Sequence, residues 1–289
     1  MDAENPPLTI HSAEEIFEDT EDSKMVFSCT AIVAYDGQTA YHGTTTARKK
    51  DLDEQAVLKT LKPIPREHIC PQFNRNLTRA PEVYIKKPVL GAYLPWFKTT
   101  IADFVLHEAE IYETLREHPH PALGRSLGCI VGEDGRITGL ALVKYEKTLF
   151  ERAFRMASFG EEEEARCIEA VEAGLQHLHS LGLAHNDLSP LNVMFTDEGK
   201  AVLIDFDACH PIGTKLIKGG SVGEWEGGLP VAVYETSSTE CDHAAVQHMK
   251  NWLKKRRDDT KLEDDTAMRD AEGNENEKAK GSAQGPLVF

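Results

Sequence analysis

The stretch that most constrains this chain is His185–Asn192, which is followed after a short apolar segment by Ile204–Asp207. Asn192 lies five residues after Asp187, and Asp205 lies eighteen residues after it. One carboxylate at this spacing can orient a hydroxyl group and accept its proton, while an amide and a second carboxylate can hold magnesium on phosphate groups. The pattern therefore predicts a site for phosphate transfer from a nucleotide.

The flanking sequence predicts how these side chains are placed. Asn192 precedes a predicted strand, Asp205 follows another, and the turn Thr196–Gly199 joins the two. We expect both oxygen-bearing side chains to face one cavity, where such hard ligands suit Mg²⁺ held jointly with phosphates. The alternative for Asp187 is an aspartate that caps its own backbone in a turn. The combined spacing of the three side chains favours the phosphate-transfer interpretation.

Composition limits the possible classes of protein. The 289 residues carry a formal charge of −16, with 48 acidic against 32 basic side chains. Because nucleic-acid binding depends on neutralising phosphates, we expect no nucleic-acid partner. No apolar run reaches the roughly 18 to 20 residues that span a bilayer, so we expect no membrane partner. Six scattered cysteines and an N-terminus without a secretory signal predict reduced thiols and a cytoplasmic location.

Both ends are predicted to be disordered. Residues 1–24 carry eight acids and one lysine, and residues 254–289 are rich in charged residues, Asn and Gly. Segments of this composition bury too little apolar area to offset the entropy of the chain. The basic run Lys254–Arg257 fits the charged C-terminus of a helix. Its alternative is a nuclear import signal, which would place the protein in the nucleus.

Between the ends, strands come first and a long helix precedes the polar loop. Asp36–Gly37 is typical of a hairpin turn, and the apolar spacing after Thr100 is helical until His118–Pro119. The predicted strands are 25–35, 38–46, 56–58, 82–87, 129–131 and 138–143, and the predicted helices are 100–117, 161–181 and 240–253.

This order of elements, together with several short motifs, resembles the protein-kinase-like superfamily. Within it, the chain is most similar to a group of short kinase-domain proteins of filamentous fungi. The resemblance implies an α+β, two-lobed fold in residues 25–253, with a small antiparallel-sheet N-lobe (25–143) and a reduced helical C-lobe (146–253). The motifs that carry it are Thr78–Pro81, Tyr84–Pro88, His118–Pro121, Leu127–Cys129, Gly135–Leu140 and His185–Asp187.

The resemblance implies a role for each candidate residue. Asp187 is the expected catalytic base, and Asn192 is expected to act in the same loop and to bind the metal with Asp205. Lys86, in the Val-x-Ile-Lys form, is expected to grip the phosphates of ATP, paired with Glu108. His185 is expected to pack and to form hydrogen bonds, and Asp242 to brace the catalytic loop. Val143 and Tyr145 flank the expected link between the lobes, where backbone groups would read the adenine edge.

Two of these assignments have competitors. Lys59, in Ala56–Lys59, has the same local form as Lys86. It lies 49 residues before Glu108, whereas Lys86 lies 22 residues before it, so Lys59 requires a long insertion. A surface lysine is the alternative for either. Glu110 competes with Glu108 for the lysine.

Several positions depart from the pattern of the superfamily. No G-x-G-x-x-G loop precedes Lys86, and the segment after Asp205 lacks Ala-Pro-Glu. Asn186 replaces the usual arginine, so we expect no activation by pairing of that arginine with a phosphorylated loop. Ser189 replaces a lysine, and Asp207 stands where glycine is usual, which puts the flexibility of the loop and the position of Asp205 in question.

Three functions fit these observations. The first is an ATP-dependent protein kinase that uses Mg²⁺ to phosphorylate serine or threonine hydroxyls of a protein substrate. The second is a small-molecule phosphotransferase of the aminoglycoside or choline kinase kind, which also has His-x-Asp followed by Asn and by Ile-Asp-Phe. The third is a pseudokinase that binds nucleotide without transferring phosphate. The sequence favours no oligomeric state.

Overall fold

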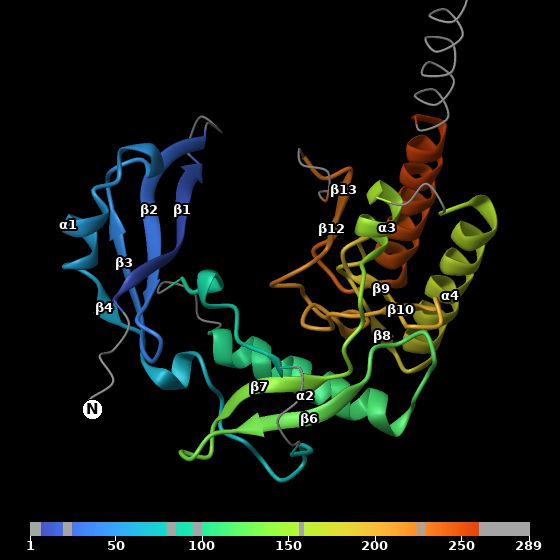
Figure 1. Cartoon of the computed structure of the whole chain (residues 1–289), viewed down its shortest axis with the longest axis horizontal. Coiled ribbons are helices and arrows are strands. Elements are labelled where there is room, and N and C mark those ends of the chain that lie inside the picture. The colour runs from blue at the N-terminus through green and yellow to red at the C-terminus, as the bar shows by residue number, and fades with distance from the viewer. Residues whose placement is uncertain are drawn as a thin grey trace, which may run out of the picture. The chain divides into compact units, whose positions relative to one another are not determined.

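The computed structural model describes residues 7–19, 25–79, 85–94, 100–155, 159–223, 225 and 229–259. The chain divides into two compact units (Figure 1). Unit 1 comprises Met1–Pro119, Gly124–Lys144 and Asp205–Asp207, and unit 2 comprises His120–Leu123, Tyr145–Ile204 and Ala208–Phe289. The short segment that carries Asp205 thus belongs to unit 1, although the residues on both sides of it belong to unit 2.

Unit 1 begins with a four-stranded antiparallel sheet in the order β1-β2-β3-β4 (Figure 1). The hairpin between β2 and β3 turns at Asp36–Gly37, where Asp36 Oδ1 accepts hydrogen bonds from the backbone N–H groups of Gln38 and Thr39. The predicted hairpin is therefore confirmed. The strands are β1 (Thr9–Asp19), β2 (Met25–Tyr35), β3 (Ala40–Thr45) and β4 (Lys62–Pro63).

The expectation that residues 1–24 are disordered is wrong for β1. This strand pairs with β2 from Thr9 opposite Tyr35 to Asp19 opposite Met25, and Ala13 is buried. The many acids of the segment suggested disorder because composition averages over both faces of a strand. Pairing satisfies the backbone groups of β1, while acidic side chains such as Glu14 remain exposed. Residues 1–6 and 20–24 lie outside the described residues.

The predicted strand at 56–58 is also wrong, because these residues belong to helix α1 (Glu54–Leu58). Asp53 caps this helix: its side chain accepts a hydrogen bond from the N–H of Ala56 at 3.1 Å. A three-residue apolar run does not distinguish strand from helix, and here the cap decides. The 3₁₀ helices of this unit are η1 (Lys49–Asp51), η2 (Arg66–His68) and η3 (Leu90–Ala92).

A second, three-stranded sheet in unit 1 carries Lys86. Its order is β5-β7-β6, from β5 (Ile85–Lys86), β7 (Ile137–Leu142) and β6 (Ser126–Val131). Gly139 of β7 lets β5 approach closely, since a Cβ there would lie 2.9 Å from the carbonyl oxygen of Lys86. The strands predicted at 129–131 and 138–143 are present in β6 and β7, which pair antiparallel as a hairpin. The strand predicted at 82–87 is present at Ile85–Lys86, and residues 82–84 lie outside the described part of the chain.

The long helix of unit 1 is α2 (Ile101–Glu117). Thr100 and Asp103 form a capping box that fixes its first turn, and the helix ends before His118–Pro119, as predicted. Its first residue, Ile101, packs in a hydrophobic cluster with Tyr93, with Val33 and Ala40 of the four-stranded sheet, and with Ile64, which directly follows β4. One core therefore joins α2 to the N-terminal sheet.

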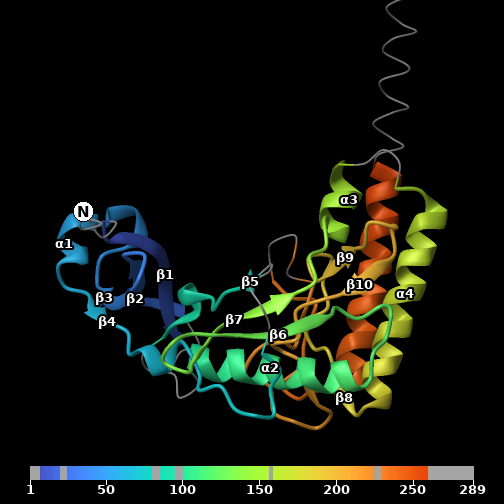
Figure 2. The ribbon, with the colours of Figure 1, turned by 60° about the horizontal axis from the view of Figure 1, so that its bottom comes forward.

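Unit 2 is built on α4 (Glu161–Ser180) and a helix at 239–259, which run side by side (Figure 2). Helix α4 packs against β10 and β8, and Gly174 lies against Leu203 and the backbone of Ala122. The other elements are α3 (Leu149–Arg155), β8 (Leu183–Ala184), β9 (Val193–Phe195), β10 (Ala201–Leu203), β11 (His210–Pro211), β12 (Ser221–Val222) and β13 (Ala232–Val233).

The last helix extends beyond Leu253, where we expected a disordered tail to begin. Arg257 forms ion pairs with Glu161 at 3.3 Å and with Glu164 at 2.6 Å, and the guanidinium of Arg256 lies over the ring of Phe154. The expectation of disorder from residue 254 is therefore wrong up to 259, because the acidic first turn of α4 binds this basic segment. Residues 260–289 lie outside the described chain. Within the described ranges, no helix combines the length and the apolar character needed to cross a membrane.

Candidate active site

Lys86 lies at the centre of an ion cluster in unit 1. Its Nζ donates hydrogen bonds to both carboxylate oxygens of Glu108 and to Oδ1 of Asp205, each at 2.8 Å. The side chain of Glu108 is 5% exposed, whereas those of Lys86 and Asp205 are 25% and 30% exposed. The structure thus brings three of the predicted site residues together, with a buried glutamate holding a partly accessible lysine.

Three different elements place these side chains. Lys86 is fixed by the pairing of β5 with β7, opposite Leu140. Glu108 lies on the buried face of α2, whereas its competitor Glu110 is exposed. Asp205 has a φ of 65°, in the left-handed region that few residues other than glycine adopt. The site therefore depends on a strained residue that the surrounding structure must hold.

Phe206 anchors this strained segment. Its ring is fully buried and packs edge-on against Tyr112 of α2, with ring centroids 5.3 Å apart and an interplanar angle of 90°. Such aromatic pairs contribute about 0.5 to 1.5 kcal/mol beyond the area that they bury. Since Phe206 follows Asp205 directly, this packing also helps to fix the carboxylate next to Lys86.

The charges of the cluster change one another's titration. Burial raises the pKa of Glu108 to about 7, against the opposing effect of the Lys86 ammonium. Burial alone would lower the pKa of Lys86, but the carboxylates of Glu108, Asp205 and Asp207 outweigh it and raise that pKa above its ordinary value. Lys86 is therefore a permanent cation at neutral pH, and Glu108 is the group of the pair that titrates there.

We expect Glu108 to make the stability of the fold depend on pH. Its pKa rises from an ordinary 4.5 to about 7, so between these values the folded state holds a proton that the unfolded state has lost. This contribution to stability is complete below the lower value and is lost as pH rises through 7. The free energy of unfolding, measured with urea between about pH 5 and pH 8, should fall more steeply for the parent than for Glu108→Gln.

Glu110→Gln is the matched control, because Glu110 is exposed on the same helix. Its pH profile should run parallel to that of the parent. Equal slopes for the parent and Glu108→Gln would show that Glu108 does not titrate in this range.

Asp207 also belongs to this acidic group, although the sequence did not predict it as a site residue. Ligand atoms of Glu108, Asp205 and Asp207 all lie within 4.8 Å of one another, and Asp207 is 8% exposed. Aspartate in place of glycine at position 207 causes no backbone strain. Among the described residues other than glycine, positive φ occurs only at Asn186 and Asp205, so position 207 does not require glycine. The sequence signal that could have identified Asp207 is its position two residues after Asp205.

The predicted catalytic loop lies in unit 2. The amide nitrogen of Asn192 donates to the carbonyl oxygen of Asp187 at 2.8 Å and to its Oδ2 at 3.2 Å. The backbone of Asn192 is in turn tied to the β9–β10 region, since the N–H of Ile204 donates to its carbonyl oxygen at 2.9 Å. The structure therefore joins Asp187 and Asn192 directly, with the Asp187 carboxylate oriented by an amide.

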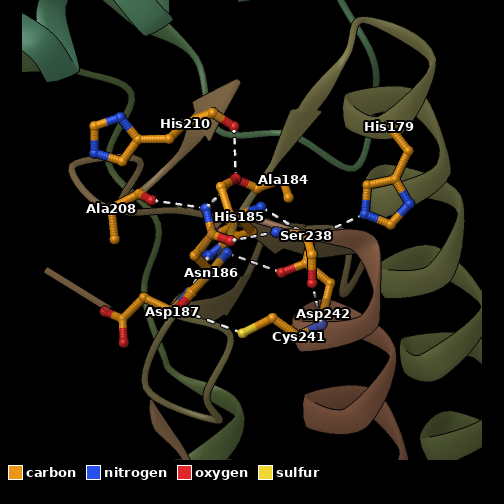
Figure 3. A network of polar contacts seen from close by, with 11 residues as sticks. His179, Ala184, His185, Asn186, Asp187, Ala208, His210, Ser238, Cys241 and Asp242 are labelled. Atoms are coloured by element: carbon orange, nitrogen blue, oxygen red, sulfur yellow. Dashed lines mark hydrogen bonds and ion pairs between the residues drawn. The ribbon is translucent and has the colours of Figure 1, made fainter. Parts of the chain in front are cut away.

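His185 and Asp242 form hydrogen bonds with this loop (Figure 3). His185 is fully buried: its Nδ1 accepts from the N–H of Asp187 at 3.3 Å, so Nε2 is the nitrogen that donates to the carbonyl of Ile204 at 3.0 Å. The carboxylate of Asp242, also fully buried, accepts from the backbone N–H groups of His185 and Asn186 at 2.9 and 2.8 Å. The predictions for His185 and Asp242 are confirmed.

The remaining candidates are placed as follows. The N–H of Val143 donates to the carbonyl of Arg125 in unit 1, and the chain enters unit 2 at Tyr145, so their role in binding adenine stays a prediction. Lys59 is exposed at the C-terminal cap of α1. Of the two candidate lysines, Lys86 is the one that contacts Glu108.

Part of the chain is similar to known protein kinases. The family model of the protein kinase domain matches residues 97–219, a range that includes Glu108, Asp187, Asn192 and Asp205 but not Lys86. The chain is 32% identical over 95 residues to the probable serine/threonine-protein kinase mkcB of Dictyostelium discoideum, covering 33% of this chain and 13% of that protein.

Two human proteins are similar over shorter stretches. Ribosomal protein S6 kinase alpha-1 is 40% identical over 58 residues, and serine/threonine-protein kinase H1 is 36% identical over 61 residues. Each stretch covers 20% of this chain, and the chain spans only 8% and 14% of those proteins. The predicted fold class is confirmed as mixed α+β with antiparallel N-terminal strands. The comparisons support a likeness to the protein-kinase-like superfamily, carried by residues 97–219.

Proposed function

We propose that this protein is an ATP-dependent protein kinase that uses Mg²⁺ to phosphorylate serine or threonine hydroxyls. The observation that carries the proposal is the ion cluster in which Lys86 contacts both Glu108 and Asp205. A lysine held by a buried glutamate is suited to bind phosphate oxygens, and an aspartate beside it is suited to bind the accompanying metal. The match of residues 97–219 to the protein kinase domain supports the same activity.

Each residue has a part in this function. Lys86 binds phosphate oxygens through charge-assisted hydrogen bonds, and Glu108 restricts its orientation. Asp187 holds the acceptor hydroxyl and receives its proton, while the Asn192 amide nitrogen orients the Asp187 carboxylate. ATP, when bound, supplies the phosphoryl group, and Mg²⁺ neutralises the charge on its phosphates.

The donor atoms suit such a metal. The amide nitrogen of Asn192 is engaged with Asp187, which leaves its oxygen as the atom of the right chemistry. The carboxylate oxygens of Asp205 and Asp207 are hard ligands of the kind that Mg²⁺ prefers. We therefore assign the metal to Asn192 and Asp205, with Asp207 close to Asp205.

Protein serine or threonine hydroxyls are the preferred acceptors because the relatives carry that activity in their names. The resemblance to short fungal kinase-domain proteins supports the same choice. We propose one kinase-like domain that extends from β1 to the helix at 239–259, divided into an N-lobe up to Val143 and a C-lobe from Glu146. We propose ATP and a protein substrate as its partners, and the cytoplasm, with the nucleus as the alternative, as its location.

A small-molecule acceptor is the second candidate, and Ser189 is the observation that favours it. This residue stands where protein kinases usually have a lysine, and its hydroxyl oxygen accepts a hydrogen bond from the N–H of Leu191 at 3.3 Å. The loop thus lacks, at this position, the positive charge that would lie close to the transferred phosphoryl group. Labelled ATP and Mg²⁺ incubated with and without cell extract, followed by separation of labelled protein from labelled small molecules, distinguishes the two acceptors.

ATP with Mg²⁺ is expected to raise the melting temperature, because a ligand that binds only the native state stabilises it by mass action. At a ligand concentration of about a hundred times Kd, the gain is about 2.7 kcal/mol. Asp205→Asn should remove most of the part that depends on magnesium, whereas Asp197→Asn, in the exposed turn between β9 and β10, should not. The measurement is a thermal shift with ATP alone and with MgATP.

Together, the thermal shift and the labelling experiment distinguish the two enzyme functions from the pseudokinase alternative. If MgATP at millimolar concentration produces no shift in the parent, both enzyme functions are contradicted. If the parent binds MgATP but labels neither protein nor small molecules, the pseudokinase alternative replaces the proposed function.

A further inference from the structure

Asn186 occupies an unusual position at the centre of a polar network in unit 2 (Figure 3). It is 1% exposed and has a φ of 61°, in the left-handed region. Asparagine is one of the few residues other than glycine that adopts this conformation readily, because its short side chain can bond locally. The position thus requires a residue that is small, polar and tolerant of positive φ.

The side chain of Asn186 ties the catalytic loop to two later segments. Its amide nitrogen donates to the carbonyl oxygens of Ala184 at 2.8 Å and Ala208 at 3.0 Å, and to the hydroxyl of Ser237 at 3.0 Å. Its amide oxygen accepts from the N–H of Ser238 at 3.3 Å. Ser237 in turn donates to the carbonyl of His210 at 3.0 Å. One neutral amide therefore holds residues 208–210 and 237–238 against the catalytic loop.

The backbone of Asn186 adds a second connection. Its carbonyl oxygen accepts from the N–H of Gly220 at 2.6 Å. Gly219 permits this close approach, because its φ is 78° and a Cβ there would lie 2.8 Å from the same oxygen. The segment 208–220, which follows Asp205–Asp207 in the chain, is thus bound to Asn186 near both of its ends.

We propose that Asn186 is a positioning residue that holds segment 208–220 against the catalytic loop permanently and without a phosphate group. The expected effect of Asn186 on catalysis rests on the proposed function. The hydrogen bonds of Asn186 are independent of that function. A phosphate on this segment would need a cationic partner, whereas the charged group bonded to Asn186 is the carboxylate of Asp242, which accepts from its N–H. An arginine at position 186 would also have to place a long side chain where the asparagine is almost completely buried.

Asn186→Gly separates the side-chain bonds from the backbone conformation, because glycine keeps positive φ at no steric cost. Hydrogen exchange of the amides in 208–222 should rise by about tenfold or more in this variant, since three buried acceptors lose their donor. Asn76→Gly, at an exposed loop position in unit 1, is the matched control and should leave the exchange of 208–222 unchanged. Phosphatase treatment of the parent should change neither its exchange nor its activity.

A milder variant covers the case in which Asn186→Gly fails to fold. Ser237→Ala removes one acceptor of Asn186 and the donor to His210, so it should raise exchange in the same segment by a smaller factor. In both variants kcat should fall while KM for ATP stays within a few fold, because the network touches the loop of Asp187 and not Lys86.

The proposal is overturned if Asn186→Gly and Ser237→Ala exchange in 208–222 like the parent, or if phosphatase increases that exchange. Hydrogen exchange does not require phosphate transfer, so this outcome is separate from failure of the proposed function. That failure would be recognised by the absence of labelled product from the parent, with the exchange results still deciding the role of Asn186.

Discussion

Asp187→Ala is expected to lower the turnover number by about a hundredfold or more while MgATP affinity stays within a few fold. Asp187 contacts the acceptor hydroxyl in the proposed function, whereas Lys86 and Asp205 bind the nucleotide and its metal. The backbone carbonyl of Asp187, which accepts from Asn192 at 2.8 Å, remains in the variant, so the loop keeps its stronger contact. Steady-state rates with labelled ATP give the turnover number, and thermal shifts give the affinity.

A second variant should lower both the turnover number and the affinity for MgATP. Asp205→Ala should lower the affinity for MgATP as well as the turnover number, since it removes the proposed metal ligand and a partner of Lys86. All variants must have the melting temperature of a folded protein before their rates are compared. If Asp187→Ala transfers phosphate as fast as the parent, Asp187 is not the catalytic residue.

Lys86→Met is expected to reduce kcat/KM by about a hundredfold or more, the usual range for loss of one preorganised charged donor. Methionine keeps much of the length and the apolar stem of lysine but removes the ammonium that contacts Glu108 and Asp205. Without this cation the pKa of Glu108, already raised to about 7 by burial, should rise further. Glu108 then becomes protonated at neutral pH, which limits the loss of stability from a buried charge.

Lys59→Met is the matched control, because Lys59 has the same local sequence but lies exposed at the end of α1. It should retain the activity of the parent. A loss of activity in Lys59→Met together with normal activity in Lys86→Met would reverse the assignment of the nucleotide lysine.

Local signals in the sequence were sufficient for much of the fold. The turn at Asp36–Gly37, the capping box at Thr100 and the stop at His118–Pro119 each act over a few residues, so their consequences follow from the nearby chain alone. The apolar spacing of α2 also places Glu108 on the buried face and Glu110 on the exposed one. Local signals also explain the wrong strand prediction at 56–58. We interpreted the short apolar run as a strand, although Asp53 just before it caps a helix.

The sequence by itself determined the catalytic-loop pattern, because spacing is a property of the local chain. The α+β class and the roles of the candidate residues followed from the resemblance of its motifs to the protein-kinase-like superfamily. Only the tertiary structure decided which distant segments meet. It paired the acidic β1 with β2, brought Lys86 to Asp205 across 119 positions, and bonded Asn186 to Ser237 across 51. Such contacts depend on which partners satisfy buried polar groups, and that choice is made by packing over the whole unit.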